Sequence, residues 1–144
     1  MREILFRAKA INRDSIDGRC RRTDYKNGDW VYGLITKPYN EKYDFPAEMR
    51  NTDGVTGSEV DSKTIGQFTG LTDKNGVKIF EGDIIQNVTE EKTAVVQWFS
   101  EHSAFMLWCK SENQVYWLYD NDFHNIEVIG NIYDNPELIG GEEQ

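Results

Sequence analysis

The chain has 144 residues, of which 38% are hydrophobic, 12% aromatic and 28% charged. This length suits one domain or two small ones, and the composition excludes collagen-like, coiled-coil and fully disordered chains. The formal net charge of −9 argues against a protein that coats DNA or RNA, because such a protein needs an excess of cations to release phosphate counterions. We therefore expect a folded, soluble protein.

The charge is unevenly distributed along the chain. Residues 1–50 hold 11 Lys/Arg against 8 Asp/Glu, a balance of +3, whereas residues 51–144 hold 5 against 17, a balance of −12. A basic end and an acidic body can attract each other within one chain or between copies. Arg19, Arg21 and Arg22 are the densest group of cations, and we take them as candidate interaction residues.

Signals for export, membrane insertion and disulfide bonding are missing from the sequence. The N-terminus has an apolar stretch of only three residues before Arg7, too short for a secretory signal, and no stretch approaches the roughly 20 apolar residues of a membrane span. Cys20 and Cys109 lie 89 positions apart, which fits neither a CxxC metal half-site nor a disulfide framework. We expect a cytoplasmic protein with reduced thiols and no membrane contact.

Short apolar runs with β-branched and aromatic residues, bounded by Gly, Asn and Asp, predict a mainly β fold. No window sustains a helical stripe. The spacing of the runs predicts a small antiparallel β-barrel-like region. The expected strands are Ile4–Ala8, Trp30–Ile35, Gly66–Phe68, Lys78–Phe80, Ile84–Val88, Thr93–Phe99, Phe105–Cys109, Val115–Leu118 and Glu127–Ile132.

A polar stretch in the first half of the chain indicates a division into two parts. Residues 36–62 contain two prolines and a Gly-bearing polar tract, which predicts a long loop or a linker. We therefore expect an N-terminal arm with strands and a long loop over residues 1–59, and a small β-barrel-like domain over residues 60–144. Asn135 and Pro136 suit the start of a short C-terminal helical turn.

Several residues have the chemistry of tight turns. Asn75 and Gly76 tolerate positive φ and predict a hairpin tip after the strand that includes Gly70. Gly82 and Asp83 precede an apolar run, where we expect glycine to take the unusual φ and the carboxylate to bond nearby backbone N–H groups. We assign structural turn roles to these five residues.

No catalytic motif is recognisable, and neither of the two histidines lies in a nucleophile motif. Asp120, Asp122 and His124 would share one face of a strand and could bind a divalent cation, but a solvated turn is the competing interpretation. Cys109 fits core packing. Cys20, beside Arg19 and Arg21, is the better candidate for a reactive thiol, against an exposed thiol without a role.

Aromatic residues are concentrated in the expected C-terminal strands. Trp98, Trp108 and Trp117 can fill a barrel core or a subunit interface. On an exposed face they could instead stack single-stranded bases, although few cations lie near them.

Three blocks of the sequence resemble the YopX family of phage and prophage proteins: residues 1–8, residues 65–85 and residues 128–138. The resemblance implies a small cytoplasmic protein encoded by a phage or prophage of a Gram-positive host, with a β-dominated fold and homo-oligomerisation. No catalytic residues can be carried over from the family. The shared blocks include the turn residues Gly70, Asn75, Gly76, Gly82 and Asp83.

The leading hypothesis is a non-enzymatic phage accessory protein that self-assembles, binds a host or phage protein and needs no cofactor. A second hypothesis is nucleic-acid binding through residues 1–26, which hold 8 Lys/Arg against 4 Asp/Glu. A third is an acidic decoy that resembles DNA. A metal-dependent enzyme built on Asp120, Asp122 and His124 ranks last.

Overall fold

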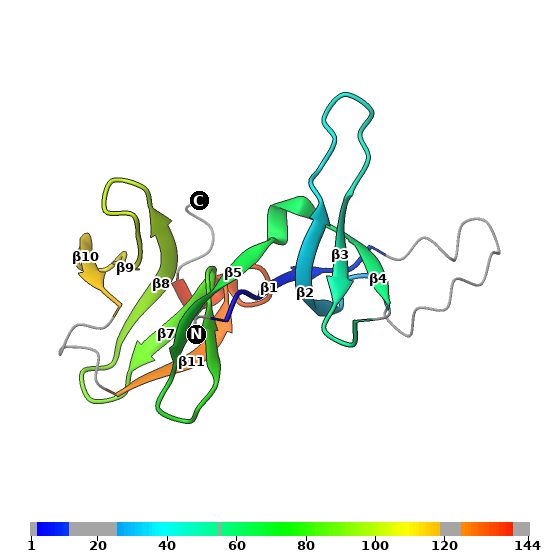
Figure 1. Cartoon of the computed structure of the whole chain (residues 1–144). Coiled ribbons are helices and arrows are strands. Elements are labelled where there is room, and N and C mark those ends of the chain that lie inside the picture. The colour runs from blue at the N-terminus through cyan, green and yellow to red at the C-terminus, as the bar shows by residue number, and fades with distance from the viewer. Residues whose placement is uncertain (1–2, 12–25, 55, 119–124, 140–144) are drawn as a thin grey trace. The chain divides into compact units, whose positions relative to one another are not determined.

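The computed structural model describes residues 3–11, 26–54, 56–118 and 125–139. The chain divides into two compact units, Met1–Gln67 and Phe68–Gln144, and the boundary falls inside strand β5 (Gly66–Thr72). Within the described residues, strands dominate and pair in an antiparallel manner (Figure 1). The mainly β fold predicted from the sequence is confirmed. None of the helices in the described ranges is long and apolar enough to cross a bilayer.

The first unit is a sheet in which the described strands follow the order β4-β3-β2-β1, with the start of β5 beside β1. A short 3-10 turn, η1 (Ser62–Thr64), follows β4. Small and aliphatic side chains form the core. The strands are β1 (Phe6–Lys9), β2 (Trp30–Lys37), β3 (Ala47–Asn51) and β4 (Gly57–Val60), and the buried core residues are Ala8, Ala10, Val31, Ala47, Met49 and Val60.

The long loop or linker expected over residues 36–62 is present only in part: residues 38–46 form a loop between β2 and β3, but β3 and β4 pair as a hairpin over residues 47–60. Alternate residues of β3 are buried. Its residues have low β propensity, but the strand pairs with β2 on one side and with β4 on the other. The buried amide of Asn51 donates to Thr56 Oγ1 at 2.9 Å and to Ser58 Oγ at 3.2 Å across the hairpin. Pairing with distant strands, rather than local propensity, makes this segment a strand.

The outer edge of β4 bonds to the chain that follows β1. Ala10 forms a bridge with Val60, and the Ile11 N–H donates to the Glu59 carbonyl at 2.8 Å. The Asp61 N–H donates to the Lys9 carbonyl at 2.9 Å. These bonds cover an edge that would otherwise be open to another strand.

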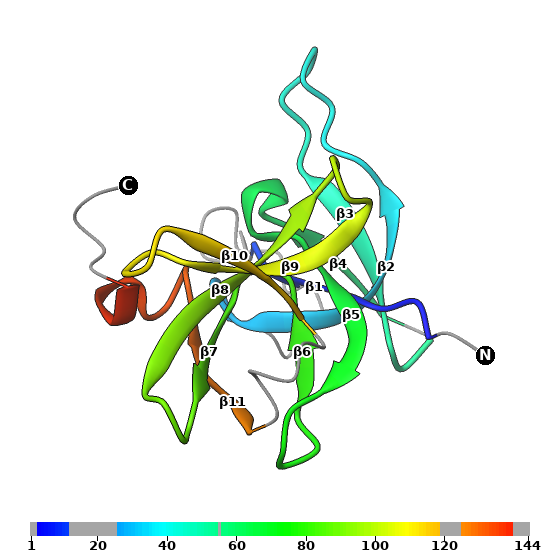
Figure 2. The same cartoon turned by 90° about the vertical axis from the view of Figure 1, so that its left-hand side faces the viewer.

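The second unit contains a sheet in the order β10-β9-β8-β7-β11, a hairpin made by β5 and β6, and a C-terminal 3-10 turn (Figure 2). The expected barrel does not close, because β10 and β11 end the strand order and do not pair with each other in the described ranges. The expected C-terminal helical turn is present. The elements are β6 (Lys78–Phe80), β7 (Asp83–Asn87), β8 (Lys92–Phe99), β9 (Ala104–Cys109), β10 (Gln114–Trp117), β11 (Ile126–Asn131) and η3 (Pro136–Ile139).

The core of the second unit is mostly aliphatic, and two of the three tryptophans expected in a barrel core or a subunit interface lie outside this core. Trp98 and Trp117 are 48% and 39% exposed. Trp98 packs edge-on against Phe105, with ring centroids 5.0 Å apart, near the end of its strand. The buried cluster consists of Ile79, Ile85, Ala94, Val96, Leu107, Cys109, Leu118 and Ile126.

Candidate protein-interaction site

Of the glycines singled out in the sequence, Gly76 and Gly82 lie in turns. Gly70 instead lies inside strand β5, where the pairing with β6 shifts register between Phe68 and Thr72. Gly70, Gly76 and Gly82 have φ of +91°, +81° and +90°, a region that side chains with a Cβ rarely adopt. The Asn75 N–H donates to Asp73 Oδ1 at 2.8 Å in the tip of the β5–β6 hairpin. These four positions are explained by backbone geometry.

Gly82 and Asp83 form the turn that leads into β7. The Gly82 N–H donates to the Val96 carbonyl at 2.8 Å, and its own carbonyl accepts from the Ile132 N–H at 2.9 Å. Asp83 is 1% exposed, and its Oδ2 accepts from the Phe80 N–H at 2.7 Å. The carboxylate bonds a nearby backbone N–H, as the sequence predicts for this turn.

Other candidates from the sequence lie outside the described residues: Arg19, Cys20, Arg21, Arg22, Asp120, Asp122 and His124. Among the side chains that the structure describes, no three potential metal ligands come together. Cys109 is buried in the core, as predicted, with its Sγ 3.4 Å from Ser111 Oγ. The reactive-thiol, metal and arginine hypotheses remain predictions.

Two described cations near the N-terminus, Arg7 and Lys9, lie against an aromatic ring. The guanidinium carbon of Arg7 lies 4.7 Å from the ring centroid of Trp30, and Lys9 Nζ lies 5.5 Å from it. Arg7 is only 7% exposed. Both cations therefore already interact within the protein, which reduces their capacity to neutralise the phosphates of a nucleic acid.

The sequence analysis placed a loop in this region but gave no site role to the loop between β2 and β3, residues 38–46, which extends beyond the strand ends of its unit (Figure 1). We call it the β2–β3 loop. Tyr39, Tyr43 and Phe45 are 44%, 59% and 62% exposed on it. The signal that could have revealed this site is a nine-residue run that begins and ends with proline and contains these three aromatic rings.

Hydrogen bonds within the β2–β3 loop hold its conformation. Asn40 and Phe45 exchange backbone hydrogen bonds of 3.0 and 3.1 Å, and the Tyr43 N–H donates to Asn40 Oδ1 at 3.2 Å. Asp44 adopts a φ of +53°, which asparagine and aspartate tolerate better than most residues. The loop is therefore a tight, internally bonded turn at the end of a hairpin.

The aromatic rings of the loop interact with charged neighbours. The Tyr39 hydroxyl donates to Asp44 Oδ1 at 2.7 Å, and this hydrogen bond raises the pKa of Tyr39 above its ordinary value. Lys42 Nζ lies 5.1 Å from the Tyr43 ring centroid, and the Tyr43 and Phe45 centroids are 5.9 Å apart. The exposed rings are thus ordered relative to one another.

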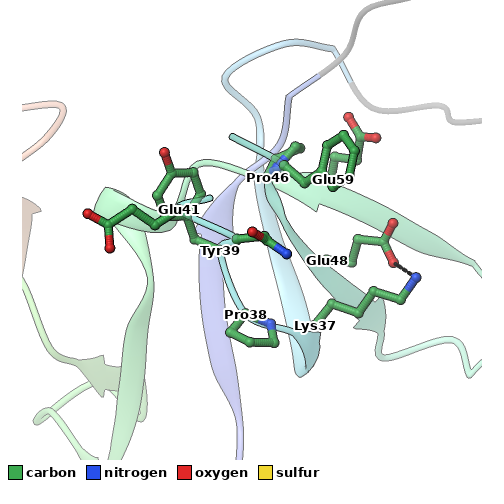
Figure 3. A pocket seen from close by; sticks show the side chains of 9 residues that line it. Lys37, Pro38, Tyr39, Glu41, Pro46, Glu48 and Glu59 are labelled. Atoms are coloured by element: carbon green, nitrogen blue, oxygen red, sulfur yellow. Dashed lines mark ion pairs between the residues drawn. The ribbon is translucent and has the colours of Figure 1, made fainter. Parts of the chain in front are cut away.

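A hollow of about 660 Å³ lies beside the β2–β3 loop, and we call it the loop hollow (Figure 3). Figure 3 shows Glu48 and Glu59 on its strand side, with Tyr39 and Glu41 on the loop side. Its size falls in the range of ordinary binding pockets. The lining residues are Lys37, Pro38, Tyr39, Asn40, Glu41, Phe45, Pro46, Glu48 and Glu59.

Charged residues form a row across three strands at the hollow. Lys37 is opposite Glu48, and Glu48 is opposite Glu59. Lys37 Nζ lies 3.4 Å from Glu48 Oε2. Two carboxylates directly opposite each other are unfavourable unless a cation lies nearby. The row has one positive and two negative side chains, so its formal charge is −1.

A second hollow of about 300 Å³ adjoins the first and shares Glu48 and Glu59 with it. We call it the strand hollow. Gly57 helps to line it, and the absence of a side chain there leaves space above β3 and β4. Arg50 also lines it, and its guanidinium donates to the Gly54 carbonyl at 3.1 Å.

The comparison with family models agrees with the resemblance seen in the sequence. A family model described as YopX protein matches residues 19–140. A solved structure, protein EF1440 from Enterococcus faecalis, is similar with a TM-score of 0.49 and 23% identity, covering 96% of this chain and 99% of that chain. A search of curated proteins found no match.

Proposed function

The chain belongs to the YopX protein family, and we propose that it works as a non-enzymatic protein-interaction module that also associates with copies of itself. The observation that supports this proposal is the β2–β3 loop with its exposed Tyr39, Tyr43 and Phe45. The proposed setting is the cytoplasm of a host cell that carries the corresponding phage or prophage. The expected partner is a protein of that host or phage.

Aromatic side chains held on a stiff loop suit protein binding. Tyrosine is enriched among the residues that contribute most to interface affinity, and burying an aromatic ring removes a large apolar area from water. The hydrogen bonds between Asn40 and Phe45 hold the loop before a partner arrives. Less conformational entropy is then lost when the complex forms.

The non-enzymatic part of the proposal comes from the sequence and from the character of the site. No nucleophile, metal or phosphate-binding motif is recognisable, and the β2–β3 loop presents rings, prolines and carboxylates instead. His102, the described histidine, packs edge-on against Trp117 with centroids 5.6 Å apart. That contact gives it a packing role in the second unit.

Site-specific photo-crosslinking tests the proposal. A Tyr43→p-benzoylphenylalanine variant should form a covalent adduct with one protein in a lysate of the host, and an excess of unlabelled wild-type chain should suppress the adduct. The double variant Tyr43→Ala/Phe45→Ala should fail to suppress it. Thermal melting would check that this variant remains folded.

The matched control places the same crosslinker at Val88, which is 43% exposed in the second unit. An adduct that forms equally well from Val88, or that the double variant suppresses as well as the wild type does, would contradict binding through the β2–β3 loop. Absence of any protein adduct from Tyr43 would overturn the proposed function itself.

A further inference from the structure

We infer that the loop hollow and the strand hollow together bind an extended segment of a partner protein that carries lysine or arginine side chains. This inference rests on the proposed function and names the chemistry of the partner. It depends on the charge of the lining, on the apolar surfaces around it, and on the way the two hollows adjoin.

The charge of the lining favours a cation. The loop hollow is lined by Glu41, Glu48 and Glu59 against Lys37, a formal balance of −2, and the strand hollow adds Arg50, so that the two hollows together have a balance of −1. Glu48 and Glu59 lie opposite each other on paired strands. A guanidinium or ammonium beside these two carboxylates would form charge-assisted hydrogen bonds with them.

The apolar part of the lining suits the stem of a long basic side chain. Pro38, Tyr39, Phe45 and Pro46 line the same hollow as the carboxylates. Lysine and arginine place their methylene groups on such surfaces while the charged end stays with polar groups. An ammonium already lies over a ring of this loop, since Lys42 Nζ is 5.1 Å from the Tyr43 centroid.

The arrangement of the two hollows favours an extended occupant. They share Glu48 and Glu59, and the strand hollow continues past these residues over Gly57. A compact ligand would occupy one hollow, whereas an extended segment can fill both with successive side chains that point the same way. The two carboxylates then lie where the hollows meet.

Fluorescence anisotropy with three labelled octapeptides tests the inference near 150 mM salt. The peptides alternate threonine with arginine, glutamine or glutamate, and alternation places the variable side chains on one face of an extended chain. We expect the arginine peptide to bind the full chain at least about tenfold more tightly than the glutamine peptide, because charge-assisted hydrogen bonds are lost with glutamine. The glutamate peptide should show no binding.

Single carboxylate variants locate the binding. Glu59→Gln and Glu48→Gln should each weaken binding of the arginine peptide by about tenfold, for the same reason. The matched control is Glu137→Gln, an exposed residue of η3 in the second unit, which should leave the affinity unchanged. Thermal melting would check the folding of all three variants, and Glu41→Gln replaces any that fails to fold.

Two outcomes would overturn the inference. Equal weakening by Glu137→Gln and Glu59→Gln would mean that the peptide is attracted by the net charge of −9 rather than by the hollows. Failure of the arginine peptide to bind, while Tyr43→p-benzoylphenylalanine still captures a protein, would reject the basic segment and leave the proposed function standing. If the arginine peptide does not bind and Tyr43→p-benzoylphenylalanine captures no protein, then both the inference and the proposed function are rejected.

Discussion

Asp73 Oδ2 accepts a hydrogen bond from the backbone N–H of Val128 at 3.0 Å, across a separation of 55 residues. The other carboxylate oxygen accepts from the N–H groups of Asn75 at 2.8 Å and Val77 at 2.9 Å. One side chain therefore shapes the tip of the β5–β6 hairpin and also fastens it to β11. The Lys74 N–H adds a bond of 3.1 Å to the Ile126 carbonyl, so the hairpin tip covers this edge of the sheet.

Replacing Asp73 by asparagine should lower the free energy of unfolding by roughly 1 to 2 kcal/mol at neutral pH, because the N–H donors lose a charged acceptor. Burial raises the pKa of Asp73, but hydrogen bonds from the Val128, Val77 and Asn75 N–H groups, with the charge of Lys74, outweigh it and lower the pKa. A lowered pKa gives stability that is present above the unfolded value of about 3.9 and is lost as the pH falls through the folded value.

Urea unfolding of both proteins from about pH 7 down to pH 3 would measure this difference. We expect the gap between wild type and Asp73→Asn to be constant above about pH 5 and to shrink in more acid solution. The exposed Glu137→Gln variant serves as control and should follow the wild type. A gap that stays the same at every pH would contradict the role assigned to the carboxylate charge.

Gly82→Val should destabilise the protein by more than about 1 kcal/mol, because Gly82 has a φ of +90° and an added Cβ would lie 3.3 Å from a ring carbon of Tyr133. Chemical denaturation measures the change in midpoint and slope. Gly57→Ala is the control, since Gly57 lies in a strand and its Cβ would be 3.4 Å from the Met49 carbonyl oxygen. An unchanged midpoint for Gly82→Val would show that the turn does not require glycine.

Gly33→Ala should destabilise the first unit by about 1 to 3 kcal/mol through overpacking. A Cβ at Gly33 would lie 1.8 Å from the Arg50 carbonyl oxygen, so β2 and β3 would have to separate. Hydrogen exchange should show faster exchange of the β3 amides than in wild type. Exchange rates equal to those of the wild type would mean that the strands are not as close as the structure places them.

Self-association is expected from the opposite charges of the two parts of the chain, +3 over residues 1–50 and −12 over residues 51–144. Light scattering coupled to gel filtration should give a mass above the 16.7 kDa of one chain, and high salt should reduce it by screening. A monomer that persists at high micromolar concentration would rule out this part of the proposal.

Binding to mixed-sequence DNA or RNA should be negligible near 150 mM salt, because the acidic second part of the chain repels phosphates and the described Arg7 and Lys9 lie over Trp30. Anisotropy titrations with labelled single- and double-stranded oligonucleotides test this from low to physiological salt. Submicromolar binding that disappears in the Arg19→Ala/Arg21→Ala/Arg22→Ala variant would establish the nucleic-acid alternative instead.

The sequence by itself determined the elements whose signals are local. Trp30–Ile35 and Lys78–Phe80 combine aromatic and β-branched residues and are strands in the structure, with the first extended by two residues. Gly76 marks the hairpin tip because few residues tolerate its φ of +81°, and Asn75 precedes it in the same turn. Turn chemistry and β propensity act over a few residues, so they can be recognised without knowing what lies nearby.

The tertiary structure decided β3, β4 and the candidate site. Ala47–Asn51 lacks the residues typical of strands and becomes one because Leu34, Ile35 and Lys37 pair with it from one side and β4 from the other. The pairing then sets Glu48 opposite Glu59 and both beside the β2–β3 loop. Cross-strand register depends on contacts between distant segments, and only the folded chain brings these carboxylates and rings around one hollow.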